Sequence, residues 1–171
     1  MSESDAKIED WIRTFRGPLV GYLVSLGARW SQAEDLAADT FAEGWLSWSR
    51  FRGRRTDLTA VGPWLCGIAA RLHWADGRRQ RRLRTVPIVD ELPAAGEPAS
   101  DPRHEALEAA IAALPAQLQQ VVRMRYLEDT PSKVVAALLG VTPKAVERRL
   151  HEARRRLMDR LDRARRAAET S

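Results

Sequence analysis

Three carboxylates recur at four-residue spacing within residues 31–48, SQAEDLAADTFAEGWLSW. In an α-helix, Asp35, Asp39 and Glu43 would lie along one face, where a pair of them could act as general acid and base or hold a metal ion for a nuclease. No histidine and no pocket-forming element lies near them in the sequence. We therefore expect these residues to have a role other than catalysis.

A second candidate pair is Cys66 and His73, which are seven residues apart and would share a helix face. Two metal ligands without a third are far more often a core residue and a surface residue. Cys66 is the only cysteine, which excludes an intrachain disulfide and a multi-cysteine zinc site. The sequence has no glycine-rich phosphate loop. We expect no enzymatic activity, no metal and no cofactor.

Basic residues are concentrated on one side of a helix predicted within residues 142–161, TPKAVERRLHEARRRLMDRL. An apolar stripe on this helix would pack against the protein. Its members are Val146, Leu150, Ala153, Leu157 and Leu161. The residues on the opposite side are Lys144, Glu147, Arg148, His151 and Arg155. Such a helix fits the major groove of duplex DNA, where Arg recognises guanine edges and Lys or Arg binds phosphate.

The segment before this helix favours DNA binding over a merely solvated surface. A short helix at residues 131–139 is followed by Gly140, which suits the left-handed position after a helix end. Thr142 and Pro143 then provide an N-cap and a first-turn proline. A short helix, a glycine turn and a longer helix predict a helix-turn-helix.

Aromatic residues are concentrated in the first half of the chain, where all six tryptophans precede residue 75. Trp64 and Trp74 flank a predicted helix that continues into RRQRR, residues 78–82. Basic side chains next to aromatic surfaces are typical of proteins that capture single-stranded nucleic acid. Most of these tryptophans are expected in the core, whereas Trp74, next to His73 and the arginines, is predicted to be partly exposed.

The helix predicted at residues 31–50 has two different faces at about 100° per residue. The outward face holds Asp35, Asp39 and Glu43 together with Leu36 and Leu46. The core face holds Ala37, Phe41, Trp45 and Trp48. Acids mixed with leucines predict a surface for a basic protein partner. Scattered exposed leucines on a solvated face are the simpler alternative.

Other helices account for most of the remaining sequence, so the predicted fold class is all-α. Residues 8–26 form a kinked helix or a helix pair around Gly17 and Pro18. A capping box of Ser31 and Glu34 is predicted to start the next helix. Residues 51–63 are expected to be a loop, with a third helix beginning near Pro63.

Residues 83–102 contain four prolines and no sustained period, which predicts a linker. It would separate two small helical domains at residues 1–82 and 103–171, the second with the helix-turn-helix.

The net charge of +5 is unevenly distributed along the chain. The first domain carries +3, the linker −3 and the second domain +5. Two basic domains favour a polyanionic partner. No apolar run reaches about 18 residues and the N-terminus is polar, so we expect a cytoplasmic protein without membrane insertion.

Three motifs, in this order, resemble the extracytoplasmic-function group of the sigma-70 family of bacterial RNA polymerase sigma factors. The first motif is AEDLAADTF at residues 33–41. The second consists of FRG at residues 51–53, WLCGIA at 64–69 and the arginine run at 78–82. The third is ALPAQLQQVVRMRYLED at residues 113–129, followed by LLGVTPKAVERRLHEARRRL at 138–157. The resemblance covers about residues 8–162. It implies a transcription initiation factor that binds core RNA polymerase, opens the minus-10 promoter element and recognises minus-35 DNA.

The resemblance also implies which residues form each interface. Those for docking on the clamp helices of the largest polymerase subunit are Asp35, Leu36, Asp39, Phe41 and Glu43. Those for the minus-10 element are Arg54, Arg55, Arg71, His73, Trp74, Arg78, Arg79, Arg81 and Arg82. Those for the minus-35 element are Lys144, Arg148, Arg149, His151 and Arg155. The polymerase flap is a further implied partner, and members of this group are often held inactive by an anti-sigma factor.

Several positions depart from the family pattern. The stretch from residue 51 to 64 is longer than usual, an expected Asp is displaced by one position to Asp76, and Ala145 replaces a usual Thr. These departures point to a distinct promoter sequence. The competing hypothesis is a stand-alone helix-turn-helix regulator that binds duplex DNA without polymerase, which would leave residues 31–41 without a function.

Overall fold

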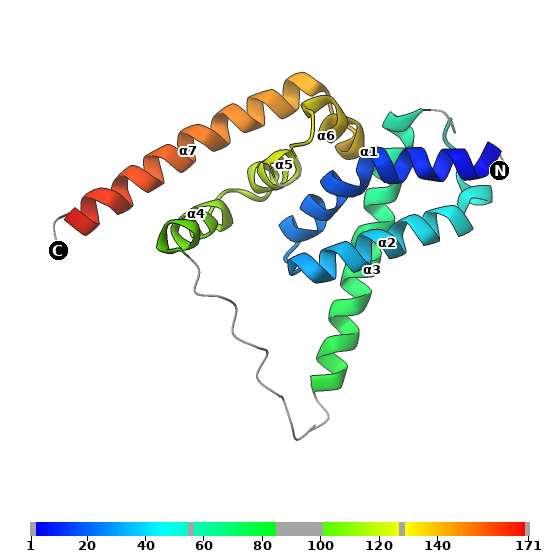
Figure 1. The fold of residues 1–171 in the computed structure, drawn as a ribbon, viewed down its shortest axis with the longest axis horizontal. Helices are drawn as coiled ribbons and strands as arrows, with labels where there is room; N and C mark the ends of the chain where they lie inside the picture. Colours follow the sequence, from blue (N-terminus) through cyan, green and yellow to red (C-terminus); the bar gives the residue numbers. More distant parts are fainter. Residues whose placement is uncertain (1–2, 55–56, 85–100, 127–128, 170–171) are drawn as a thin grey trace.

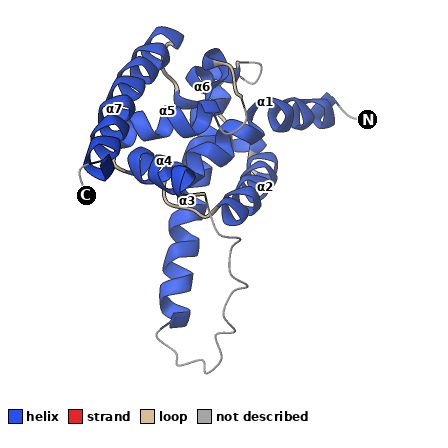
Figure 2. Ribbon diagram, turned by 60° about the vertical axis from the view of Figure 1, so that its left-hand side comes forward, coloured by secondary structure: helices blue, strands red, loops and turns tan. Residues whose placement is uncertain are grey.

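The computed structural model describes residues 3–54, 57–84, 101–126 and 129–169, and every regular element that they form is a helix, which confirms the predicted all-α class (Figure 2). In chain order the elements are α1 (Glu3–Ser25), α2 (Trp30–Leu46), the short 3-10 helix η1 (Trp48–Arg50), α3 (Leu58–Arg84), α4 (Pro102–Ala112), α5 (Ala116–Tyr126), α6 (Ser132–Leu139) and α7 (Pro143–Glu169). Arg55 and residues 85–100 of the predicted linker lie outside the described residues. None of the described helices combines the length and apolar character needed to cross a membrane.

Helix α1 is continuous and contains Pro18. Proline lacks the amide hydrogen that would bond to the carbonyl of Thr14, and its ring crowds that turn, so a bend is expected there. Figure 1 shows that α1 changes direction near its middle. Of the two alternatives left open by the sequence, the kinked helix is the one observed.

The start of α2 differs from the prediction. The helix begins at Trp30, with Arg29 as its N-cap, and Gln32 Oε1 accepts a hydrogen bond from the Arg29 amide (3.4 Å). Glu34 lies instead 3.6 Å from the guanidinium of Arg16 on α1. The predicted capping box of Ser31 and Glu34 was therefore wrong, because a cation on a neighbouring helix pairs with the glutamate that the local pattern assigned to the cap.

Helix α3 begins earlier than predicted, at Leu58 rather than near Pro63. Asp57 stabilises this start, since its Oδ1 accepts hydrogen bonds from the Thr59 hydroxyl (2.6 Å) and amide (2.9 Å). These two bonds hold the pKa of Asp57 below its ordinary value. Pro63 lies in the second turn, where it removes only the amide that would bond to the Thr59 carbonyl. The loop expected over residues 51–63 therefore ends at Asp57.

The C-terminal helices pack around α7. Both α5 and α6 contact it, and α4 also lies against it (Figure 1). Gly140 follows α6 with φ of 66° and ψ of 33°, the left-handed conformation predicted for it. Thr142 Oγ1 accepts a hydrogen bond from the Ala145 amide (3.2 Å) at the start of α7. These features confirm the predicted helix-turn-helix of α6 and α7.

One hydrophobic core runs through both halves of the described chain. Helix α5 packs against α1, and α6 packs against α3. Completely buried side chains come from the first half, such as Phe15 and Leu65, and from the second, such as Met124 and Leu138. The two groups of helices on either side of the predicted linker are therefore in direct contact.

Candidate nucleic-acid and protein interfaces

The outward side of α2 carries an acidic surface. Asp35 and Asp39 are exposed and lie one helical turn apart. Leu46, at the end of the helix, is 81% exposed, although large apolar side chains are usually buried. Together these three residues give the combination of acids and leucine predicted for docking a protein.

Leu36 does not belong to this surface, contrary to the prediction. Its side chain is only 6% exposed. Its buried neighbours on α2 are Ala33, Ala37, Thr40, Phe41 and Gly44. Most of these residues are small, and at Gly44 an added β-carbon would lie 3.0 Å from Leu65 of α3. The buried side therefore includes Leu36, whereas Trp45 is only half-buried. Phe41 is buried, as expected of a residue that mainly packs.

Two residues predicted for different interfaces form an ion pair. The carboxylate of Glu43 on α2 accepts a hydrogen bond from the guanidinium of Arg71 on α3. Both side chains are partly exposed, so the pair lies at the surface and connects the two helices. Because Arg71 balances the charge of Glu43, Asp35 and Asp39 are the carboxylates best placed to face a partner.

Four aromatic side chains pack together at the N-terminal end of α3. The rings of Trp11 and Trp48 meet edge-on with centroids 4.5 Å apart, and Phe51 stacks on Trp48 at 5.1 Å. Trp64 lies 4.8 Å from Phe51. Phe51 in this cluster anchors the beginning of the segment that carries Arg54. The contacts also confirm the packing role expected of Trp11, Trp48 and Trp64.

The C-terminal half of α3 projects beyond the neighbouring helices, as Figure 2 shows, and carries exposed cations. Trp74 is 53% exposed, which confirms the prediction. The three arginines Arg78, Arg79 and Arg82 line a shallow hollow of about 350 Å³ with Ala75. Arg54 and Arg81 are also exposed. An accessible aromatic ring near several cations is the combination that single-stranded nucleic acid requires.

His73 is directed away from these arginines. Its Nε2 lies 3.2 Å from the carbonyl oxygen of Leu26, just after α1, and its ring packs edge-on to Trp74 at 5.2 Å. Its Nδ1 is buried and has no hydrogen-bond partner among the described residues. His73 therefore positions α3 and Trp74, and it does not share the surface of the arginines as the sequence analysis expected.

Cys66 faces another element altogether. Its Sγ lies 3.4 Å from the carbonyl oxygen of Leu138 on α6, and burial raises the pKa of the thiol to about 12. His73 and Cys66 therefore make contacts with different segments and do not form a pair. Within the described ranges no cluster of three or more potential metal ligands occurs.

Asp76, which the sequence analysis noted as displaced by one position, joins α3 to α2. Its Oδ2 accepts hydrogen bonds from the side-chain amides of Gln32 (2.6 Å) and Gln80 (2.8 Å). The contact with Gln32 helps to fix the direction in which the exposed half of α3 leaves the other helices. Asp76 thus has a structural role that its sequence position alone did not reveal.

The two faces of α7 are arranged as predicted. Val146, Leu150 and Ala153 are at most 2% exposed. The exposed residues opposite them are Lys144, Glu147, Arg148, His151 and Arg155. Arg149 is half-buried at the edge between the two faces. The N-terminal half of α7 is therefore packed by one face and presents cations on the other.

Glu152 modifies this basic face. It accepts hydrogen bonds from Arg156 Nε (2.6 Å) and Arg155 Nη2 (2.9 Å), which lower the pKa of Glu152 and raise that of Arg155. The pairing directs Arg155 along the helix surface and balances part of its charge. Lys144 and Arg148, nearer the start of α7, are better placed to meet an anion.

Tyr126 supports α7, a role that the sequence did not predict. Arg154 Nε donates a hydrogen bond to the tyrosine hydroxyl (2.8 Å), and the guanidinium carbon lies 5.8 Å from the ring centroid. Arg125 also contacts the ring and pairs with Asp129 at 2.8 Å. Tyr126 is the single aromatic residue after position 75, and that isolation was the available signal for a special contact.

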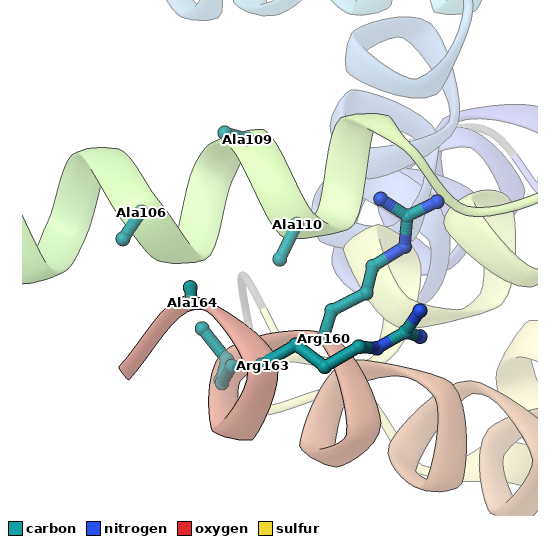
Figure 3. Close-up of a pocket in the computed structure, with 7 residues that line it drawn as sticks. Ala106, Ala109, Ala110, Arg160, Arg163 and Ala164 are labelled. Atoms are coloured by element: carbon teal, nitrogen blue, oxygen red, sulfur yellow. The ribbon is translucent and has the colours of Figure 1, made fainter. Parts of the chain in front are cut away.

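A groove of about 380 Å³ separates α4 from the C-terminal half of α7. Figure 3 shows Ala106 and Ala110 pointing from α4 toward α7, with Ala164 opposite and the side chains of Arg160 and Arg163 along one edge. Arg160 Nη2 lies 3.4 Å from the carbonyl oxygen of Ala113. The groove is lined by small apolar side chains and contains no nucleophile or metal ligand among its lining residues.

Comparison with known proteins identifies relatives for both halves. The Sigma-70 region 2 family matches residues 11–83, and the Sigma-70 region 4 family matches residues 104–157. The probable RNA polymerase sigma factor RfaY of Xanthomonas campestris pv. campestris is 28% identical over 132 residues, which are 71% of this chain. Those residues are 32% of RfaY, so the chain spans about a third of the length of this relative.

A solved structure has a similar fold. It is the sigma factor RpoE in complex with the anti-sigma factor NepR from Bartonella quintana, with a TM-score of 0.50 and 18% sequence identity. The match covers 90% of this chain and 96% of that chain. The helical arrangement described above therefore has a counterpart that includes both halves.

Proposed function

Because the chain belongs to the extracytoplasmic-function group of the sigma-70 family, we propose that it is a transcription initiation factor that binds core RNA polymerase and directs it to specific promoters. Such a factor recognises the minus-35 DNA and opens the minus-10 element, and it has no reaction of its own. RNA polymerase is its principal protein partner and promoter DNA its second ligand. A factor with these ligands acts in the bacterial cytoplasm.

One observation carries this proposal: an acidic, leucine-containing surface on α2 occurs in the same chain as a helix-turn-helix with a basic exposed face. A stand-alone regulator of duplex DNA needs only the second surface. Asp35 and Asp39 would repel DNA phosphate, so their exposed position is accounted for by a protein partner.

Docking on polymerase would use Asp35, Asp39 and Leu46 directly. The clamp helices of the largest subunit are the proposed contact. Leu36 and Phe41 would support this surface from within, since both are buried beneath it. Glu43 would act through its ion pair with Arg71, which holds α2 against α3.

The minus-10 element would be held at the projecting half of α3. Trp74 would stack against an unpaired base, and the nearby arginines would bind the backbone. Those arginines are Arg54, Arg71, Arg78, Arg79, Arg81 and Arg82. Arg55 belongs to the same proposal from its sequence position, and His73 would act by holding the ring of Trp74 in place.

The minus-35 element would meet the N-terminal half of α7 in the major groove. Lys144, Arg148 and His151 lie on its outer face, where Arg148 is the main candidate for recognition of a base. Arg149 and Arg155 would bind phosphate at the edges of the groove. Glu147 would be tolerated beside a base amino group, to which a carboxylate can accept a hydrogen bond.

Two further protein partners are the polymerase flap and an anti-sigma factor. The polymerase flap would bind the C-terminal half, where the groove between α4 and α7 offers an apolar surface edged by Arg160 and Arg163. An anti-sigma factor would compete for the polymerase surfaces. The similarity to RpoE, a sigma factor solved with its anti-sigma factor NepR, supports this second proposal.

Copurification with core polymerase and run-off transcription test the function. The parent protein should bind core enzyme and start transcripts from a genomic library, whereas Asp35→Ala combined with Asp39→Ala should lose most of the binding to core. Glu9→Ala, an exposed acid on α1, is the matched control. If the double variant binds core as well as the parent does, the sigma-factor proposal fails and the stand-alone regulator is favoured. Metal-dependent cleavage of DNA by the protein alone would instead indicate a nuclease.

A further inference from the structure

A hollow of about 340 Å³ lies between the bend of α1 and the start of α6, outside the interfaces proposed above. The two helices pack against each other there (Figure 1). Sites for small ligands usually have volumes of about 300–1,000 Å³, so the hollow is large enough for a small molecule. Its lining residues are Arg13, Thr14, Gly17 and Pro18 from α1, and Thr130, Pro131 and Val134 from α6 and the two residues before it.

The side chain of Thr130 in the wall of this hollow is buried and unpaired. It is 5% exposed, and its hydroxyl has no hydrogen-bond partner among the described residues, although its amide donates to the Arg125 carbonyl oxygen (3.0 Å). Thr40, the other buried threonine, donates its hydroxyl hydrogen to the Leu36 carbonyl oxygen at 2.6 Å. A buried hydroxyl without a partner is unfavourable. The position of Thr130 therefore indicates a ligand that accepts its hydrogen bond.

The start of α6 adds two more donors. Its N-cap residue is Pro131, which provides no side-chain cap, and the Pro131 carbonyl accepts hydrogen bonds from the amides of Val134 (2.8 Å) and Val135 (3.2 Å). The amides of Ser132 and Lys133 come before these, so they have no partner within the helix. Helix amides point toward the N-terminus, which here is the end that lines the hollow. Such an end attracts anions.

Helix α1 contributes a cation. The guanidinium of Arg13 lines the hollow and forms an ion pair with Asp10, in which the two side chains are 77% and 57% exposed. Exposed ion pairs of this kind are weak, so the guanidinium can turn to a stronger anion. The acid next to Thr130 is Asp129, which pairs with Arg125 at 2.8 Å. Its charge is therefore partly balanced.

Thr14 lies beside Arg13 and supplies both kinds of hydrogen-bonding group. Its hydroxyl has no partner among the described residues. Its carbonyl oxygen lacks the amide that normally bonds to it in a helix, because residue 18 is proline. A phosphate group that carries a proton can accept a hydrogen bond from the hydroxyl and donate one to the carbonyl.

We propose that this hollow binds the phosphate group of a small molecule. Two hydroxyls, two amides and a guanidinium surround it, and phosphate has enough acceptor oxygens to use several of them at once. The rings and methyl groups of Pro18 and Val134 line the remaining wall, which suits the organic part of a phosphorylated metabolite. Free phosphate and the phosphate of a DNA backbone have the same chemistry, so the experiment distinguishes these sources.

A ligand that contacts both α1 and α6 stabilises the folded chain, because it binds the folded state and not the unfolded one. The melting temperature should therefore rise with ligand concentration. This inference needs neither polymerase nor a promoter, so it can fail or succeed independently of the proposed function.

Equilibrium dialysis of the full chain against radiolabelled inorganic phosphate, and separately pyrophosphate, tests the site directly. We expect saturable binding to one site per chain at constant ionic strength set with sodium chloride. Thermal unfolding in the same solutions should give a higher melting temperature than chloride alone. Phosphate salts also stabilise proteins generally, because they are excluded from protein surfaces, so the comparison between variants decides the result.

Thr130→Val is the main variant, because it keeps the shape of the side chain and removes the hydroxyl. It should weaken phosphate binding about tenfold, while the ligand-free protein should be at least as stable as the parent, since an unpaired buried hydroxyl is lost. Thr40→Val is the matched control. It removes a hydroxyl that is already paired, so it should destabilise the ligand-free protein and leave phosphate binding unchanged.

Charge variants show whether the ligand is an anion. Arg13→Gln should weaken binding about tenfold, as expected for the loss of a charge-assisted hydrogen bond. Asp10→Asn should strengthen binding several-fold, because the guanidinium of Arg13 is then no longer balanced by a carboxylate. Arg103→Gln, which removes an exposed arginine of α4 outside the hollow, is the control and should change nothing.

Three results would overturn the proposal. The first is the absence of saturable binding, which would mean that the hollow holds only solvent. The second is equal affinity of Thr130→Val and the parent, because the phosphate would then be an adventitious ion only. The third is competition by duplex DNA together with equal weakening of duplex binding in Thr130→Val, which would assign the site to the DNA backbone.

Discussion

Helices α3 and α7 have the same length, 27 residues, and both present exposed cations, but those of α3 lie toward its C-terminal end, whereas those of α7 begin in its first turn and continue along the helix. The arginines of α3 follow Trp74 toward the C-terminal end, where the negative end of the helix dipole attracts positive charge. Lys144 lies in the first turn of α7 and Arg148 in the second, where the dipole repels cations. Helix stability therefore explains the cations of α3 but not those at the start of α7.

This difference shows which residues are the stronger evidence for function on each helix. On α7 the evidence is the cations themselves, because a solvated helix start would favour acids. On α3 it is the ring of Trp74, because a large apolar side chain that stays 53% exposed gives up much of the stabilisation that burial would provide. The comparison predicts an interface for duplex DNA on α7 and an interface for unpaired bases on α3.

The largest expected effect concerns the aromatic cluster that supports the start of α3. Trp11→Ala should lower the free energy of unfolding by about 3–5 kcal/mol, because its ring is 2% exposed and packs against Trp48 and Trp64. Urea denaturation followed by circular dichroism measures this. Trp30→Ala is the matched control, since that ring is 42% exposed, and it should cost far less. Equal losses in the two variants would contradict the role of the aromatic cluster.

Replacing Trp74 tests whether α3 and α7 bind different parts of the promoter. Trp74→Ala should weaken binding of a single-stranded minus-10 oligonucleotide to the polymerase complex by about 1–3 kcal/mol, because one base loses its stacking surface. Binding of minus-35 duplex should stay unchanged. Trp74→Phe, which keeps an aromatic ring, should recover part of the loss. Equal weakening of both ligands would remove the distinction between α3 and α7.

The corresponding change on α7 is Arg148→Ala. If Arg148 recognises a base, the variant should lose about 1–3 kcal/mol for one base pair of the minus-35 site, whereas a phosphate contact would weaken all sequences equally and reduce the salt dependence. Binding to a set of singly substituted duplexes measures this. Arg156→Ala, which removes an arginine bonded to Glu152 further along α7, should affect the same duplexes less. No change on any duplex would remove Arg148 from the interface.

The sequence predicted local features of this fold better than contacts between distant segments. Gly140, Thr142 and the apolar stripe of α7 are local signals, and all three are found as expected. The prediction for Leu36 was wrong, because the large aromatic residues suggested which side of α2 faces the core, whereas the buried side consists mainly of small residues, of which Gly44 lies against Leu65 of α3. The ion pair of Glu43 with Arg71 joins residues 28 positions apart, and no spacing rule indicates it.

Contacts between the two halves were the least predictable. The linker composition suggested two separate domains, but nothing local to Gly21 or Gly62 indicates that another helix lies against it. The cost of glycine inside a helix was the available signal, because such a residue needs a packing reason. The position of His73 was also missed, since its partner is a backbone carbonyl, at Leu26, that no side-chain pattern reveals.

The smallest expected effect concerns the acid within the basic helix α7. Hydrogen bonds from Arg156 and Arg155 lower the pKa of Glu152 below its ordinary value of 4.5, so the folded state binds this proton less readily than the unfolded chain. The resulting stabilisation is present above about pH 4.5 and is lost as the pH falls through the lower, folded-state pKa. Glu152→Gln should therefore slightly lower the melting temperature at pH 7 and leave it nearly unchanged in strong acid. Glu147→Gln, which replaces an exposed acid on the same helix, is the control. An equal pH dependence of the two variants would contradict the assignment to Glu152.

The same substitution tests the role of Arg155 in DNA binding. Because Glu152 balances part of the charge of Arg155, Glu152→Gln should strengthen binding to all duplexes alike. That result would assign Arg155 to the phosphate contacts, in contrast to Arg148.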